Sequence, residues 1–121
     1  MIETLKKIAR KDYLGAHGDC IDMIHANHHD PRPYHALGLI AFDHKNIVKA
    51  AELFARAAGL DEKNAVYWAA SAQALSVLSR QDEARISADR AAELPINDPQ
   101  TADTVAVVFS RAGFHERAIP F

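Results

Sequence analysis

The stretch from His25 to His35 (HANHHDPRPYH) holds four of the seven histidines of this 121-residue chain. Imidazole is a common metal ligand, and on a helix His25 shares a face with His28 or His29, with Asp30 close by to add an oxygen. A structural zinc site needs four fixed ligands at characteristic spacings, and this stretch matches no such pattern. We therefore interpret it as a polar turn between two helices and expect no metal site, with adventitious binding of nickel or zinc as the alternative.

The other reactive side chains form no catalytic motif. The sequence contains no GxSxG, no HExxH, no glycine-rich phosphate loop and no CxxC. Cys20 is the only cysteine and falls on the apolar stripe of its helix, so we expect a buried, unreactive thiol. His44 beside Asp43, and His115 beside Glu116, are neighbours at helix ends, where solvated surface charge is the simpler interpretation. We expect no enzyme activity in this chain and no cofactor.

Composition and charge favour a helical protein of the cytoplasm. Hydrophobic residues make up 49% of the chain and charged residues 25%, and the net charge is −2, with no basic excess to attract nucleic acid or an anionic membrane. No apolar stretch is long enough to span a bilayer, and the N-terminus (MIETLKKIARK) lacks the apolar run of a signal peptide. A single cysteine allows no internal disulfide, as expected in a reducing compartment. Abundant alanine with only five glycines favours tightly packed helices.

Small and apolar residues recur with a period of 34 along the whole chain. The clearest series is Ala16, Ala50, Ala84 and Ala118. Five further series keep the same step: Cys20, Phe54 and Ala88; Met23, Ala57 and Ala91; Tyr34, Trp68 and Ala102; Gly38, Ala72 and Ala106; Ala41, Leu75 and Phe109. A fixed period of this length is the signature of a repeat architecture.

The segment 31–64 is the clearest copy, and it resembles a tetratricopeptide repeat (TPR), a helix–turn–helix unit of about 34 residues. The matching residues are Tyr34, Leu37, Gly38, Ala41, Ala50, Phe54 and Ala57. The resemblance implies an all-α fold, a right-handed superhelix of about seven or eight helices in stacked antiparallel pairs. We expect one domain over 1–121, with a partial unit at 1–30, full units at 31–64 and 65–98, and a truncated unit at 99–121.

Capping residues place the helix ends. Asp30 precedes Pro31 and Asp98 precedes Pro99, which combines an N-cap acceptor with a proline whose missing N–H is harmless, and Asn64 is expected to cap in the same way. The expected helices are near 2–10, 12–27, 31–44, 47–60, 65–79, 81–94, 99–112 and 115–121.

Within a unit, two small residues should let the helices approach closely. Gly38 and Ala50 fill this role in the clearest copy, and Phe54 is expected to be a core anchor. Trp68 is expected to pack between helices and not to stack on a ligand.

The resemblance also implies where a partner binds, because in this family the first helix of each unit lines a concave groove. The residues at those positions are Arg32, His35, Leu39, Phe42, Val66, Ala69, Gln73, Ser76, Gln100, Asp103, Val107 and Ser110, with Arg111 beside them. Such a groove is apolar in the middle and polar at its ends, which suits a helix or an extended peptide with apolar anchors. It lacks the paired Lys and Asn with which some members grip a C-terminal carboxylate. We expect Leu39→Asp or Phe42→Asp to abolish binding while the fold survives.

Two alternatives concern the end of the chain. The segment DPQTADTVAVVFSRAGFHERAIPF is similar to the repeat region before the catalytic domain of bacterial sulfotransferase-type proteins. That similarity implies a scaffold or regulatory region of a larger enzyme whose catalytic domain lies beyond Phe121. Alternatively, Ile119 and Phe121 lie at an open edge through which the chain could self-associate. The first hypothesis remains a non-catalytic module that binds a protein or peptide segment, with no nucleic-acid or membrane partner.

Overall fold

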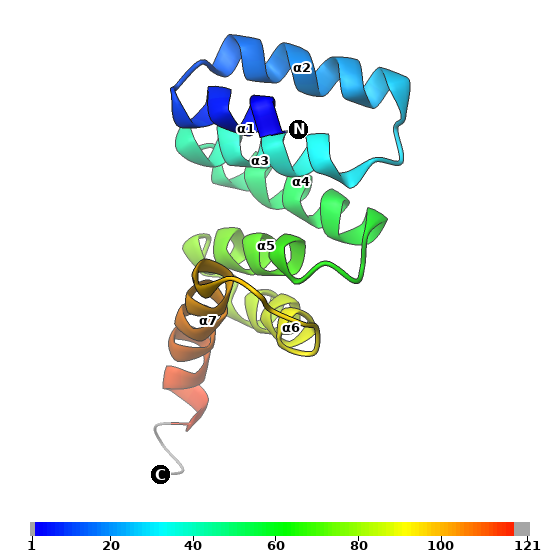
Figure 1. The fold of residues 1–121 in the computed structure, drawn as a ribbon. Coiled ribbons are helices and arrows are strands. Elements are labelled where there is room, and N and C mark those ends of the chain that lie inside the picture. Colours follow the sequence, from blue (N-terminus) through cyan, green and yellow to red (C-terminus); the bar gives the residue numbers. More distant parts are fainter. Residues whose placement is uncertain (1, 118–121) are drawn as a thin grey trace.

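The computed structural model describes residues 2–117, and the side chains of residues 3–111. This part of the chain forms seven α-helices and no strand (Figure 1). The helices are α1 (Ile2–Ala9), α2 (Tyr13–Ala26), α3 (Pro31–Asp43), α4 (Ile47–Leu60), α5 (Ala65–Val77), α6 (Gln81–Ala92) and α7 (Pro99–Arg117). The all-α fold expected from the repeat is confirmed.

The helices stack as successive antiparallel pairs. α1 packs on α2, α3 on α4, and α5 on α6, and each pair packs on the next through the contacts of α2 with α3 and of α4 with α5 (Figure 1). α7 opens the last unit and lies against both α5 and α6. The result is a helical solenoid in which every unit rests on its neighbours in the sequence. None of the helices in this part of the chain is long and apolar enough to cross a membrane.

Three helix starts are fixed by the caps that the sequence predicts. Asp30 and Asn64 each accept a hydrogen bond, at 3.0 Å, from the backbone N–H two residues further on. Asp98 accepts one at 2.8 Å from the backbone N–H three residues further on. These side chains satisfy amide groups that the first turn of a helix leaves without partners. Local chemistry therefore sets the boundaries of α3, α5 and α7.

The turns inside the first three units share one backbone geometry. Lys11, Lys45 and Ser79 have φ angles of 67°, 64° and 62°, and they are 34 residues apart. In each turn the next residue donates its N–H to the carbonyl five residues earlier, over 2.8, 2.9 and 3.0 Å respectively. This is the Schellman arrangement, in which one left-handed residue ends a helix. Three helices therefore end with the same arrangement, and in none of them is the left-handed residue a glycine.

The fourth position of this series is Gly113, where the sequence predicts a turn between helices 99–112 and 115–121. That prediction is wrong, because α7 continues through Gly113 to Arg117 as one helix. In each earlier unit the helix after the turn packs against the first helix of the next unit. Gly113 does not take the left-handed conformation of the three earlier turn residues, since no described glycine has a positive φ, and the helix is therefore not ended there. Residues 118–121, with Ile119 and Phe121 of the proposed open edge, lie outside the described residues.

The core is made of small residues at the repeat period. Ala16, Ala50 and Ala84 are fully buried, as the spacing predicts. The close approach at Gly38 is also confirmed: a Cβ atom built there would lie 2.5 Å from the ring atoms Cδ1 and Cε1 of Phe54. Phe54 is only 2% exposed, so its ring lies against the backbone of α3 and cannot easily move away.

Candidate functional site

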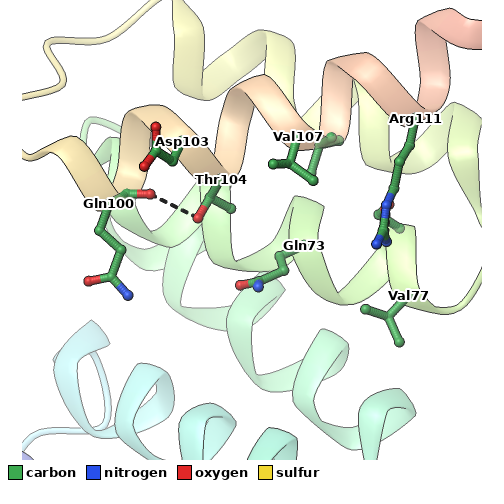
Figure 2. A pocket seen from close by; sticks show the side chains of 9 residues that line it. Gln73, Val77, Gln100, Asp103, Thr104, Val107 and Arg111 are labelled. Atoms are coloured by element: carbon green, nitrogen blue, oxygen red, sulfur yellow. Dashed lines mark hydrogen bonds between the residues drawn. The ribbon is translucent and has the colours of Figure 1, made fainter.

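A hollow of about 450 Å³ lies between α5 and α7, the first helices of two successive units (Figure 2). Nine of the described residues line it: Gln73, Ser76 and Val77 from α5, and Gln100, Asp103, Thr104, Val107, Val108 and Arg111 from α7. We call this feature the α5–α7 hollow. It lies on the helices that the repeat pattern assigns to the groove.

Helical periodicity brings these side chains to one place. On α7, Gln100, Thr104, Val107 and Arg111 are spaced by four, three and four residues, which places them on one face of the helix. Figure 2 shows this face turned toward α5, with Gln100 near one end of the hollow and Arg111 at the other. The Asp98 cap therefore positions the site indirectly, since it fixes where α7 begins.

The middle of the hollow is apolar and accessible. Val77 is 47% exposed and Val107 is 51% exposed, whereas Val108 below them is buried. The hydroxyl of Thr104 donates a hydrogen bond to the carbonyl of Gln100 at 2.9 Å, so it is already occupied. The middle of the hollow therefore offers methyl groups to a partner.

The two ends of the hollow carry opposite charges. Arg111 is exposed, and its Nη1 donates to Oγ of Ser76 at 3.5 Å, at the C-terminal side of the hollow. Asp103 is exposed on the rim near the start of α7. Among the described residues, neither side chain takes part in an ion pair. Both charges are thus available to a ligand.

Six of the thirteen predicted groove residues meet in this hollow: Gln73, Ser76, Gln100, Asp103, Val107 and Arg111. Ser110 is exposed on α7 but does not line the hollow, and Ala69 is 3% exposed and lies in the core. Val66 is exposed and lines a different recess, between the start of α5 and the loop that precedes α7. Arg32 is exposed and forms an ion pair of 2.7 Å with Asp30.

The three remaining predicted residues, His35, Leu39 and Phe42, lie on α3. All three are half-buried, and Leu39 and Phe42 pack against core clusters that include Ala50 and Phe54. An aspartate at position 39 or 42 would put a charge into this packing. Those substitutions therefore test folding together with binding, and a residue of the hollow is the better choice.

His35 is held between two aromatic rings. Its centroid lies 5.4 Å from that of Phe54 and 5.1 Å from that of Tyr67, and its Nδ1 is buried without a hydrogen-bond partner. Burial lowers the pKa of the imidazole from its usual 6.5 to about 4. His35 is therefore neutral at physiological pH and supplies no positive charge to a carboxylate ligand.

The sequence pattern did not find Val77, Thr104 and Val108. Their signal was in the helical spacing, because Val77 follows Gln73 by four residues and Thr104 precedes Val107 by three. The family pattern gives one position per turn, whereas the hollow also takes in the flanks of both helices.

The histidine stretch forms the turn between α2 and α3. The rings of His28 and His29 lie 4.2 Å apart, the N–H of His29 donates to Oδ1 of Asn27, and the Tyr34 hydroxyl donates to the carbonyl of His28. Among the residues that the structure describes, no three His, Cys, Asp or Glu side chains are grouped so that they could hold a metal ion. Cys20 is fully buried, and burial raises the pKa of its thiol to about 11, which keeps it protonated.

No family model and no curated protein matches the chain. Among solved structures, the chain is similar to the type III secretion chaperone SycD of Yersinia enterocolitica, in complex with a peptide of the translocator YopD. The TM-score is 0.76 at 21% identity, over 92% of this chain and 85% of that chain. At this level of identity the likeness shows the fold, which is a TPR-like helical repeat. Nothing in these comparisons supports the similarity to sulfotransferase-type proteins.

Proposed function

We propose that this chain is a non-catalytic interaction module that binds a peptide segment of another protein in the α5–α7 hollow. The observation that carries the proposal is the exposed pair Val77 and Val107 inside a recess with polar ends. Accessible apolar side chains with a polar rim are typical of interaction sites. A recess of this size takes a few side chains of a partner, as in recognition of a short segment.

The likeness to SycD supports this proposal, because that protein has the same fold and was solved with a peptide bound. The groove residues predicted from the repeat remain part of the proposal, with the six that line the hollow as its centre. A cytoplasmic location also belongs to it, since the only cysteine is free and buried.

The test compares two valines that are equally exposed. Val107 in the hollow and Val48 on α4 are both 51% exposed, so an aspartate at either should be tolerated by the fold. Peptides are selected from a displayed random heptapeptide library on the wild-type protein, and their affinities are measured for each variant. We expect Val107→Asp to weaken binding at least about tenfold, and Val48→Asp to leave it unchanged.

Circular dichroism shows whether each variant is folded. If the selected peptides bind Val107→Asp as tightly as the wild type, or if the wild type selects no peptide, the hollow is not a peptide site and the proposal fails.

A further inference from the structure

The charged groups of the α5–α7 hollow lie at a defined spacing. Asp103 and Arg111 are eight residues apart on α7, which is about 12 Å along the helix axis at 1.5 Å per residue. Among the side chains that the structure describes, they are the only charged ones that line the hollow, and Val107 lies midway between them. The hollow therefore presents a negative end, an apolar middle and a positive end in a row.

A β-like extended peptide matches this row. Its residues advance by about 3.3 Å each, so residues i and i+4 are about 13 Å apart, close to the axial separation of Asp103 and Arg111 on α7. Residues i, i+2 and i+4 point to the same side of an extended chain. A basic residue, an apolar residue and an acidic residue at those three positions would meet Asp103, Val107 and Arg111 together.

An α-helical ligand fits less well. A helix has a diameter of about 10–12 Å with its side chains, whereas neighbouring extended strands lie only about 5 Å apart. The narrower extended segment is therefore the better match to a recess between two helices.

We propose that the hollow selects extended peptides in which an acidic and a basic side chain are four residues apart, with an apolar side chain midway between them. The proposal rests on the proposed function, and it adds the chemical class of the partner and its orientation. The basic residue lies at the Asp103 end, and the acidic residue lies at the Arg111 end. Each contact is an exposed charge pair, so charge determines the order of the residues and the apolar contact provides most of the affinity.

The test exchanges the two charges without changing the composition of the protein. Random displayed heptapeptides are selected in parallel on the wild type and on the double variant Asp103→Arg with Arg111→Asp. We expect the wild type to enrich peptides with the acidic and basic residues in one order at i and i+4. The double variant should enrich the opposite order, and synthetic peptides should lose about threefold to tenfold in affinity on the protein that did not select them.

A single substitution covers the case in which the double variant does not fold. Arg111→Gln removes one charge from an exposed position, and it should abolish the preference for the acidic residue while the basic and apolar preferences remain.

The other outcomes separate this inference from the proposed function. If the same peptides are enriched on both proteins, their binding depends on Val107, and Arg111→Gln keeps the preference for the acidic residue, the hollow binds peptides without reading their charge, and only the inference fails. Enrichment of charges eight residues apart with helical spacing of apolar residues, tested with a longer library, would also overturn it. If no peptide is enriched, or if Val107→Asp binds as well as the wild type, both the inference and the proposed function fail.

Discussion

The guanidinium carbon of Arg90 lies 5.2 Å from the centroid of the Trp68 ring, and 34 residues earlier Arg56 lies 5.4 Å from the Tyr34 ring. Trp68 and Tyr34 each donate a hydrogen bond to the backbone carbonyl six residues before them, at 2.9 and 3.3 Å. The same joint, an aromatic ring that contacts an arginine and donates a hydrogen bond to a loop carbonyl, therefore occurs twice. In each copy, an aromatic residue in the first turn of a unit connects the preceding loop to the second helix of that unit, which explains why Trp68 serves packing.

The cation–π part of this joint can be measured with a double-mutant cycle. We expect Trp68→Leu and Arg90→Met to be coupled by about 0.5–1 kcal/mol in the free energy of unfolding, because a guanidinium over an indole ring is favourable at a partly exposed site. The matched cycle of Tyr34→Leu with Arg56→Met should give a coupling of the same sign. Urea unfolding of the seven proteins measures both couplings, and additive effects in both cycles would show that the ring contacts contribute no energy.

Gly38→Ala should destabilise the fold by about 1–3 kcal/mol, because the new methyl group would meet the Phe54 ring at 2.5 Å. Gly59 on α4 provides the control, since a Cβ atom there would meet no other part of the protein within 4 Å outside its own stretch of helix. Gly59→Ala should raise stability by about 0.5–1 kcal/mol through helix propensity. Equilibrium urea denaturation compares the two variants. Equal effects of the same sign would mean that α3 and α4 do not touch at Gly38.

Lys45→Gly should stabilise the protein by about 0.5–1 kcal/mol, because Lys45 holds a φ of 64° that costs an L-residue about 1–2 kcal/mol and costs glycine nothing. Ala55→Gly is the control, as an exposed residue in the interior of α4, and it should lower stability by a similar amount. Opposite shifts in the midpoint of thermal unfolding are expected. Destabilisation by both substitutions would show that the turn does not use the left-handed conformation in solution.

Stability should fall on acidification because of His35. Its pKa is about 4 in the folded protein and close to 6.5 in an unfolded chain, so the unfolded state binds a proton first as the pH falls through 6.5. The full stability is present above pH 6.5, and up to about 3 kcal/mol is lost between pH 6.5 and pH 4. His35→Leu, which removes the titrating group, should flatten the profile in this window. A profile unchanged by that substitution would show that His35 is accessible to protons in the folded state.

The helix starts could be predicted from local sequence signals, whereas the end of α7 and the burial of some groove residues could not. Asp30 before Pro31 predicts a helix start, because the cap involves only neighbouring residues, and α3 begins at Pro31 as predicted. At Gly113 the period predicts a fourth left-handed turn, but the backbone remains helical, so position in the repeat did not determine the conformation there. The same division holds at the site. The repeat pattern predicted Val107 for the groove, and Val107 lines the α5–α7 hollow. Phe42 was predicted for the groove in the same way, but it is partly covered because it packs against the cluster that contains Ala50 and Phe54.

The walls of the α5–α7 hollow belong to different units, so the recess is a property of their junction. A segment bound there would contact both α5 and α7 and so hold the two units together. By linkage, it would raise the free energy of detaching α7 from the rest of the solenoid in proportion to the logarithm of its concentration above Kd. The last unit would then be the part of the molecule whose rigidity reports whether a partner is present.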